Sequence, residues 1–437
     1  MGIYFDPAVE TMPREELEKL QLERLKWQAT RCYHNSPFYK NKMDRAGVVP
    51  ENMKTLEDIQ RIPFVTKDEL RQEQEEYPPL GRYVLADPEE WGELHPSTGT
   101  TGRPVNTIWS HGDTERITDF TARVLYGLGV RKGDIIQNGF SYGLWVAGMS
   151  THYAAQKMKC FIIPIGAAMS ERHIEYLVQL GPTFLAATPS FALYIAERIK
   201  EQGINPRDLQ LRGGFFGGEG GTESEATRHK LESRLGIDAY DIYGLAEIGP
   251  TMAAECTEKA GLHWTEDHHL IEIINPETNE PCNPGELGIL VITHLTREAT
   301  PMLRYWSNDY ASITYETCRC GRTHARSEGG IVGRADDLII YRGAKFYPLQ
   351  VEKIVRSFNE LSDEFKIVLF SEEGSGLESC TIQVELVAGA SEKPIKEQLT
   401  KALKEELLVT PQVEYLPHGS LERTTFKAKR ILDQRKK

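Results

Sequence analysis

The chain has 437 residues, of which 40% are hydrophobic and 26% are charged. This length and composition indicate a globular protein of two or three domains, and they exclude a collagen-like, coiled-coil or largely disordered chain. The 51 Lys and Arg residues against 64 Asp and Glu residues give a net charge of −13. This acidic balance argues against nucleic acid or an anionic membrane surface as the main partner.

The targeting features of the sequence and its cysteine content predict a cytoplasmic protein. No apolar run approaches the roughly 20 residues needed to cross a bilayer. The N-terminal sequence MGIYFDPAVE lacks the basic and apolar regions of a signal peptide. The seven cysteines, an odd number in a large chain, suit a reducing compartment better than a disulfide framework.

Residues 1–80 carry the pattern of polar helices. In Pro13–Asn35, Leu17 and Leu25 are among the apolar residues that recur at helical spacing between Glu, Lys and Arg. Thr66, with Glu69 three residues later, is a capping-box signature for a second helix. The pattern predicts a solvated helical cap region over residues 1–80.

From about residue 95, short apolar strands alternate with helices, which predicts an α/β architecture with parallel strands. The predicted buried strands are Phe161–Pro164 and Phe184–Ala187, and the predicted helices are Glu171–Leu180 and Ser190–Gln202. The turn-rich stretch Asn275–Gly285 predicts a hairpin connection leading into a strand over Gly288–His294.

The composition changes again near Gly333, and this change predicts a separate C-terminal α+β domain over residues 334–437. Residues 1–333 then form the N-terminal domain. The expected elements beyond the boundary are helices over Val351–Phe358 and Glu392–Leu408 and strands over Phe365–Phe370 and Cys380–Val387.

The stretch STGTTGRP combines glycines, hydroxyl side chains and one positive charge. Its members are Ser97, Thr98, Gly99, Thr100, Thr101, Gly102 and Arg103. Backbone N–H groups turned inward by the glycines, together with the hydroxyls, suit a nest around polyphosphate oxygens. The chain has neither a Walker loop nor a G-x-G-x-x-G fingerprint, and a Ser/Thr/Gly stretch taken alone is more often an ordinary surface turn.

Three further glycine-containing connections follow in order: GGFFGGEGGT, YDIYGLAEIGP and GRADDLIIYRGAKFYP, at residues 213–222, 240–250 and 333–348. Glycine permits the backbone to approach a ligand closely. Four such connections in this order favour a ligand site over chance.

With these motifs, the chain resembles the adenylate-forming acyl-CoA synthetase superfamily and, within it, the phenylacetate–CoA ligase group. The resemblance runs from HNSPFYK to FKAKRILDQR, and SYGLWVAGMSTHYAA, LTREATPMLRYWSNDY and CRCGRTHAR are typical of the subgroup. It implies an α/β fold with a large N-terminal adenylate-forming domain, in which helices flank β-sheets, and a small mobile C-terminal α+β domain.

The resemblance also implies a two-step reaction. A carboxylate attacks the α-phosphate of ATP, giving an acyl-adenylate and pyrophosphate, and the thiol of coenzyme A then displaces AMP. The implied partners are ATP, Mg²⁺, coenzyme A and a small carboxylic acid, and a homodimer is a further expectation from the family. Such catalysis depends mainly on positioning and charge neutralisation.

Residue roles follow from the same resemblance. The STGTTGRP loop holds the β- and γ-phosphates, with Arg103 where the family often has Lys. Glu247 contacts Mg²⁺, and Asp336 is the hinge of the C-terminal domain. Lys427 in TTFKAKR matches the catalytic lysine of adenylation, although Phe426 replaces the usual glycine; the alternative is a solvated tail charge. The implied nucleotide contacts are Gly218, Glu219, Asp241, Tyr243, Gly244, Asp309 and Arg334.

The subgroup implies an aromatic or arylacetic acid in an apolar pocket. Candidate lining residues are Tyr142, Trp145, Phe215, Ala246, Ile248 and Pro250, each of which is equally an ordinary packing residue. The stretch PIGAAMSER departs from the glycine- and serine-rich family pattern, so an aliphatic or hydroxy acid stays open.

Cysteine and histidine near the middle of the chain suggest a structural zinc site. Cys318 and Cys320 form C-x-C, and Cys256 and His263 lie upstream. Thiolates with imidazole are the ligand set of such a site, and reduced buried thiols are the alternative. The roles of His268 and His269 stay open.

The leading function is therefore an acid–thiol ligase. Two alternatives remain: a nucleotidyl transferase that stops at AMP transfer, and a non-catalytic nucleotide- or metal-binding module. Retention of Glu247, Asp309, Arg334 and Lys427 together disfavours the module.

Overall fold

The computed structural model describes residues 2–97, 103–371, 378–423 and 429–435. The chain divides into two compact units. Unit 1 comprises residues 1–166 and 240–330, and unit 2 comprises residues 167–239 and 331–437. The boundary between residues 330 and 331 lies close to the composition change near Gly333. Each unit is described by itself.

The N-terminal segment of unit 1 is helical, as the sequence predicted, and its elements are α1 (Pro7–Glu10), α2 (Arg14–Asn35), α3 (Pro37–Ala46), η1 (Pro50–Asn52), η2 (Leu56–Arg61) and α4 (Lys67–Glu76). Thr66 and Glu69 form the predicted capping box of α4. The inner face of α2 buries polar side chains as well as apolar ones: Gln21 Nε2 donates to Glu266 O at 2.9 Å, and Gln28 Nε2 donates to Arg297 O at 2.7 Å. These bonds tie α2 to distant parts of unit 1.

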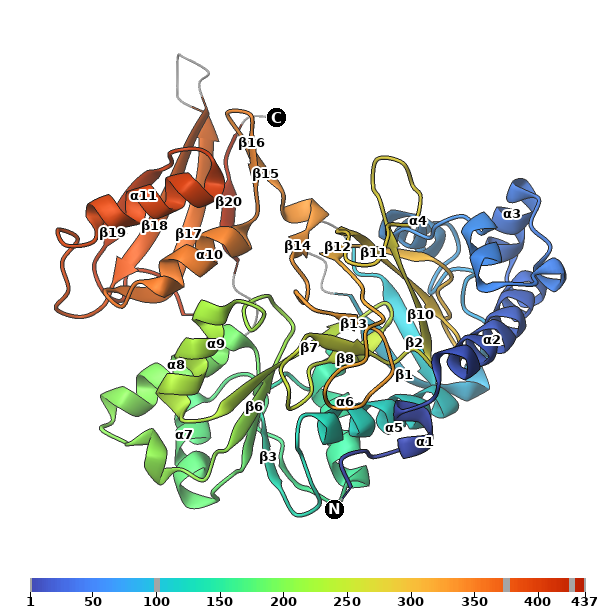
Figure 1. Cartoon of the computed structure of the whole chain (residues 1–437), viewed down its shortest axis with the longest axis horizontal. Helices are drawn as coiled ribbons and strands as arrows, with labels where there is room; N and C mark the ends of the chain where they lie inside the picture. The colour runs from blue at the N-terminus through green and yellow to red at the C-terminus, as the bar shows by residue number, and fades with distance from the viewer. Residues whose placement is uncertain (1, 98–102, 372–377, 424–428, 436–437) are drawn as a thin grey trace. The chain divides into compact units, whose positions relative to one another are not determined.

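Antiparallel strands form most of the sheet structure of unit 1. The pairs are β1 (Trp91–Pro96) with β2 (Asn106–Ser110), β10 (His269–Ile274) with β11 (Gly288–His294), β11 with β12 (Tyr305–Ala311), β7 (Asp238–Leu245) with β8 (Gly249–Ala254), β8 with β9 (Leu262–Trp264), and β9 with β13 (Arg326–Ser327). The predicted hairpin connection therefore joins β10 to β11 (Figure 1).

Unit 1 also contains a parallel pair, β3 (Ile135–Asn138) with β4 (Phe161–Ile163). The helices α5 (His111–Gly127) and α6 (Val146–Lys157) pack against each other beside it, and the short turn η3 (Pro88–Glu90) precedes β1. The prediction that Phe161–Pro164 is a buried strand was wrong for its first residue, because Phe161 is 57% exposed. Only Ile163 of β4 is buried, so an apolar run here does not mean burial on both faces.

The first part of unit 2 alternates helices and strands: α7 (Ser170–Gln179), β5 (Phe184–Ala187), α8 (Pro189–Glu201), η4 (Pro206–Asp208), β6 (Gly213–Phe216) and α9 (Glu225–Leu235). β5 and β6 are parallel, which confirms the predicted α/β alternation. Leu185, Phe191, Phe216 and Leu231 lie in the core that these elements share.

The C-terminal part of unit 2 is α+β, as predicted, and contains β14 (Gly333–Arg334), η5 (Ala335–Asp337), β15 (Ile339–Tyr341), β16 (Ala344–Phe346), α10 (Pro348–Ser357), β17 (Leu361–Ser371), β18 (Glu378–Leu386), α11 (Lys396–Leu407), β19 (Gln412–Leu416) and β20 (Ile431–Asp433). The order β19-β18-β17-β20 forms one sheet, with β17 and β18 antiparallel. Helices α10 and α11 pack on this sheet (Figure 1).

Ion pairs join α9 to the C-terminal part of the same unit. Lys230 Nζ lies 2.9 Å from Asp363 Oδ1, and Arg234 pairs with the other oxygen of this carboxylate. Arg356 on α10 donates to Thr227 Oγ1 at 3.0 Å. These charges are buried or half-buried, so each depends on its partner.

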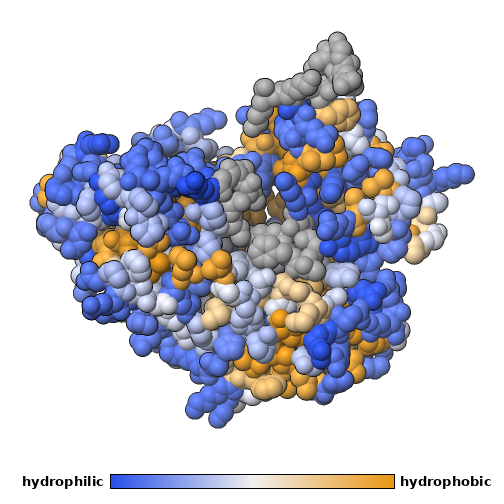
Figure 2. Space-filling model, turned by 180° about the vertical axis from the view of Figure 1, so that it is seen from behind, coloured by the Kyte–Doolittle hydropathy of each residue, from blue (hydrophilic) through white to orange (hydrophobic). Residues whose placement is uncertain are grey.

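The surface agrees with the acidic, polar composition. Figure 2 shows a face that is largely hydrophilic, with apolar patches between the polar side chains. In the ranges that the structure describes, no helix is long and apolar enough to span a bilayer.

Candidate active site and metal centre

The connection from β7 to β8 carries the motif YGLAEIG. Tyr243 and Gly244 lie near the end of β7, which ends at Leu245, and Gly249 begins β8. A Cβ on Gly244 would lie 2.8 Å from Gly249 O and 2.8 Å from Thr251 N, so this crossing of backbones admits only glycine. The turn is closed by the Ile248 N–H, which donates to Leu245 O at 3.2 Å. Glu247 is therefore presented on a tight, fixed turn.

Two predicted nucleotide contacts meet in unit 1. The Tyr243 hydroxyl lies 2.5 Å from Asp309 Oδ2 on β12. Asp309 is 3% exposed, and its N–H donates to Ser307 Oγ at 3.0 Å. The Tyr243 ring packs edge-on against Trp264 at 5.7 Å. The pair combines a half-buried aromatic ring with a carboxylate, which is the chemistry that purine stacking and hydroxyl recognition require.

Glu247 is paired with a lysine that the sequence did not single out. Its carboxylate is 5% exposed, and its Oε1 lies 2.8 Å from Lys67 Nζ. Lys67 is the first residue of α4, directly after the Thr66 cap. The capping signature located the start of this helix, but nothing in the local sequence indicates a partner 180 positions later. A buried carboxylate that is paired with a single cation can still offer an oxygen to a hard cation such as Mg²⁺.

Asp241, the third predicted contact near this turn, lies on β7 and is 8% exposed. Its N–H donates to Glu255 Oε2 at 2.9 Å, and its carbonyl accepts from the Glu255 N–H at 3.0 Å. These two hydrogen bonds with Glu255 fix the backbone of β7 at Asp241, two residues before Tyr243.

The predicted phosphate loop is closed at its neck. Ser97 N–H donates to Val105 O at 2.7 Å, and Ser97 Oγ accepts from Val105 N–H at 2.9 Å. Arg103 is exposed, and its carbonyl accepts from Arg71 Nε at 3.0 Å. Its guanidinium lies 3.9 Å from Glu75, so this charge stays at the surface. Thr98, Gly99, Thr100, Thr101 and Gly102 lie outside the described residues.

The candidate acid-pocket residues fall in both units. In unit 1, Tyr142 OH accepts from Asn138 Nδ2 at 2.8 Å, and Trp145 packs edge-on against Phe140. Tyr142, Trp145 and Ala246 are half-buried, whereas Ile248 and Pro250 are buried. Phe215 is fully buried in β6 of unit 2. These positions stay predictions.

The remaining nucleotide and hinge candidates belong to unit 2. Gly218 has a φ of 88°, a conformation that favours glycine. Glu219 Oε1 accepts from Ser190 N–H at 2.8 Å, at the start of α8. Arg334 lies 3.3 Å from Asp336, which is exposed. Lys427 lies outside the described residues, and its role stays a prediction.

His268 and His269, whose roles the sequence left open, are hydrogen-bonded side chains, of which His269 is buried and His268 is half-buried. His268 Nδ1 lies 2.8 Å from Thr296 Oγ1, and His269 Nδ1 lies 2.8 Å from Thr265 Oγ1. Burial lowers the pKa of His268 to about 4 and that of His269 to about 3. Both rings are therefore neutral near pH 7.

The four predicted soft ligands converge in unit 1. The Sγ atoms of Cys256, Cys318 and Cys320 and a ring nitrogen of His263 all lie within 4.8 Å of one another. Cys256 Sγ is 3.9 Å from Cys318 Sγ, and Cys320 Sγ is 3.7 Å from His263 Nε2. In a tetrahedral zinc site with bond lengths of about 2.3 Å to sulfur and about 2.05 Å to nitrogen, these separations are about 3.8 Å and about 3.6 Å. The donor set therefore fits zinc.

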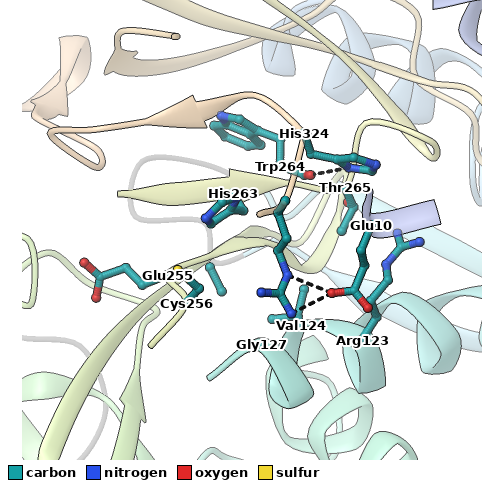
Figure 3. Close-up of a pocket in the computed structure, with 12 residues that line it drawn as sticks. Glu10, Arg123, Val124, Gly127, Glu255, Cys256, His263, Trp264, Thr265 and His324 are labelled. Atoms are coloured by element: carbon teal, nitrogen blue, oxygen red, sulfur yellow. Dashed lines mark hydrogen bonds and ion pairs between the residues drawn. The ribbon is translucent and has the colours of Figure 1, made fainter. Parts of the chain in front are cut away.

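The surroundings of the cluster suit a closed structural site. Hydrogen bonds with Cys256 and then His263 lower the pKa of the Cys320 thiol. Cys256 and His263 line a cavity of about 40 Å³, which Glu10 and its ion-pair partner Arg322 also line. Figure 3 shows Glu10, Cys256 and His263 at this cavity. Thiolate character together with a charged outer layer favours metal binding.

Comparison with known proteins identifies the family. An AMP-binding enzyme model matches residues 94–306, and an AMP-binding enzyme C-terminal domain model matches residues 343–435. A phenylacetate-coenzyme A ligase of Thermus thermophilus is 37% identical over 99% of this chain and 100% of its own length. The chain belongs to the phenylacetate-coenzyme A ligase family of AMP-binding enzymes. A Pseudomonas putida member is also 37% identical, over 98% of this chain and 97% of its own length.

The structural comparison agrees. A 2-hydroxyisobutyryl-CoA ligase in the postadenylation state, in complex with R3-HIB-AMP, matches with a TM-score of 0.93 and 30% identity over 99% of this chain and 92% of its own. The predicted superfamily and adenylate-forming α/β fold are thus confirmed. The protein is an AMP-forming acid–thiol ligase that uses ATP and coenzyme A.

Proposed function

We propose that this ligase activates an aromatic or arylacetic acid, with phenylacetate as the leading candidate. The support is that full-length relatives named phenylacetate-coenzyme A ligase are 34–37% identical. The structural relative acts on 2-hydroxyisobutyrate at 30% identity, which makes a small hydroxy acid the second candidate.

One observation carries the adenylation chemistry: the buried Glu247 carboxylate lies on the tight turn directly after β7, the strand that carries Tyr243, and it pairs only with the Lys67 ammonium among the ion pairs of the described residues. Glu247 would hold Mg²⁺ together with phosphate oxygens. The ion would offset the charge of the phosphates and so aid attack by the acid. Tyr243 would stack on adenine, and Asp309 would accept bonds from the ribose hydroxyls.

The other proposed roles belong to residues outside this turn. The 97–103 loop would hold the β- and γ-phosphates, with Arg103 adding charge. Lys427 would neutralise the α-phosphate and carboxylate during adenylation alone, delivered by motion about Asp336. A Lys427→Ala variant would then lose carboxylate-dependent pyrophosphate release but still convert supplied acyl-adenylate to thioester.

The test is an acid panel with ATP and Mg²⁺, with and without coenzyme A. Phenylacetate-dependent AMP and thioester formation, with a higher kcat/KM than 2-hydroxyisobutyrate, supports the proposal. A higher kcat/KM for 2-hydroxyisobutyrate supports the second candidate. AMP transfer without any thioester supports an adenylyltransferase. If no acid in the panel is turned over, the result contradicts the proposal that this site catalyses adenylation.

We further propose that Cys256, His263, Cys318 and Cys320 hold a structural zinc ion. The fit of their separations to tetrahedral geometry supports this assignment. Metal analysis of purified protein tests it, and less than about one tenth of a zinc per chain would contradict it.

A homodimer and a cytoplasmic location are proposed from the family resemblance and the cysteine usage. Gel filtration with light scattering and cell fractionation test them.

A further inference from the structure

The turn that carries Glu247 is anchored from outside through the carbonyl of the next residue. Ile248 O accepts from His294 Nε2 at 2.6 Å and also from Arg297 Nη2. On the other side of Glu247, Ala246 O lies 3.1 Å from Thr107 Oγ1, which shares its single proton between this carbonyl and His95 O at 2.8 Å. The backbone of the turn is thus held on both sides of the carboxylate, by residues far away in sequence.

The surroundings of His294 make its Nε2 a hydrogen-bond donor. Met302 N–H donates to His294 Nδ1 at 2.9 Å, so this nitrogen is the acceptor. Burial, followed by the nearby Arg297 charge, lowers the pKa of His294 well below its usual value, so the ring is neutral. A neutral imidazole that accepts at Nδ1 carries its proton on Nε2, which faces Ile248 O. Met302, in the connection between β11 and β12, therefore selects the His294 tautomer that is protonated at Nε2.

Burial of the Arg297 guanidinium at this position has an unfavourable desolvation energy. Arg297 is 5% exposed, and its Nη1 has no hydrogen-bond partner among the described residues. A Cβ on Gly249 would lie 3.2 Å from Arg297 Nη2, so the guanidinium is pressed against the start of β8. Since a buried guanidinium without full pairing is unfavourable, packing stability alone does not account for it.

We propose that His294 and Arg297 are positioning residues for the adenylation step, which fix the Glu247 carboxylate by clamping the Ile248 carbonyl. This inference rests on the proposed role of Glu247 toward Mg²⁺. Three anchors hold the turn, whereas the Glu247 side chain has only the Lys67 ion pair in the described part of the chain. Loss of an anchor lets the carboxylate shift, and a shift of about 1 Å costs up to about 100-fold in rate.

The variants are chosen to separate clamping from folding. Arg297→Met removes the donors and keeps the length, and Arg297→Lys restores one donor and the charge. His294→Leu removes the donor, and His294→Gln keeps an N–H donor in reach. The control is His269→Leu. His269 is as buried as His294 and lies directly opposite it across β10 and β11, but it bonds to Thr265 instead of the Glu247 turn.

The readout is acid-dependent pyrophosphate–ATP exchange, titrated with Mg²⁺ at fixed ATP. We expect Arg297→Met and His294→Leu to raise the Mg²⁺ concentration for half-maximal rate at least about fivefold and to lower the maximal rate about 10- to 100-fold. Arg297→Lys and His294→Gln should recover most of both losses. His269→Leu should lose stability without changing the Mg²⁺ dependence.

Two results would overturn the inference. One is an unchanged Mg²⁺ dependence in folded Arg297→Met and His294→Leu proteins, and the other is an equal change in His269→Leu. If Arg297→Met does not fold, His294→Leu decides by the same measurement, since it removes the other donor to Ile248 O. Failure of the proposed function is distinct: the unmodified enzyme would then show no acid-dependent exchange, or Glu247→Gln would keep the normal Mg²⁺ dependence.

Discussion

The Glu247 turn and the Cys256–His263–Cys318–Cys320 cluster lie on neighbouring strands of unit 1 but are built in opposite ways. In the cluster, four ligand atoms converge within 4.8 Å and contact one another. At the turn, a single carboxylate pairs with Lys67, and the surrounding polar groups bind the backbone instead.

This difference teaches how the same sheet serves structure and catalysis. A structural zinc ion takes all its ligands from the protein, so the fold must bring all four ligand atoms to one point. Mg²⁺ keeps waters and substrate oxygens in its shell, so a catalytic site supplies few ligands and holds them rigidly. We therefore expect changes at the turn to affect rate and changes in the cluster to affect stability.

The largest expected effect is on rate, from Glu247→Gln. Loss of the carboxylate charge should lower acid-dependent pyrophosphate exchange at least about 100-fold, with little change in melting temperature. Stopped exchange assays and thermal melts measure the two quantities. Glu272→Gln is the matched control, since Glu272 is a carboxylate with a 10% exposed side chain that pairs with Arg304 at 2.9 Å. A control that loses as much rate as Glu247→Gln would break the comparison.

The next largest effect is on stability, from Cys320→Ser. We expect loss of bound zinc and a melting temperature lower by about 5 °C or more, because structural zinc contributes folding energy directly. At a temperature where the variant stays folded, kcat should remain within about twofold. Cys282→Ser, a change of a half-buried cysteine outside the cluster, should keep the metal. Retained zinc in Cys320→Ser would contradict the assignment.

Acid should destabilise the region behind the turn through its histidines. Burial lowers the folded-state pKa of His268, His269 and His294, whereas the unfolded chain binds these protons below about pH 6.5. The unfolded state then holds more protons, so stability falls as pH drops from about 6.5 toward 4, by up to about 1.4 kcal/mol per histidine per pH unit. Urea melts at several pH values measure this slope, and His269→Gln should reduce it. An equal slope in that variant would show that His269 does not contribute.

The smallest expected effect comes from Tyr243→Phe. The ring that would stack on adenine stays, but the hydroxyl bond to Asp309 is lost. We expect KM for ATP to rise about three- to tenfold, as for loss of one hydrogen bond, with kcat nearly unchanged. Steady-state kinetics with varied ATP measure both. A large fall in kcat would mean that Tyr243 acts on the reacting atoms.

The sequence predicted local features well because their causes are local. Thr66 and Glu69 predicted the start of α4, and ligand chemistry selected the Cys256 and His263 cluster before its geometry was known. The pairing of Lys67 with Glu247 was missed, since a lysine at the start of a polar helix looks like any solvated charge.

The binding of His294 and Arg297 to the backbone of the Glu247 turn was missed for a similar reason. The run Gly288–His294 was correctly predicted as a strand, but a terminal histidine gives no sign of its tautomer or partner. Gln21 and Gln28 on α2 looked like surface residues, and only the fold brings them to buried carbonyls. Contacts between residues hundreds of positions apart depend on tertiary packing, which periodicity does not encode.

The most direct test of the central claim is single-turnover formation of acyl-adenylate from phenylacetate and ATP, titrated with Mg²⁺, in the unmodified enzyme and in Glu247→Gln. The account predicts Mg²⁺-dependent adenylate formation that is at least about 100-fold slower in Glu247→Gln, followed by thioester formation when coenzyme A is added. Equal rates and equal Mg²⁺ dependence in the two proteins would contradict it.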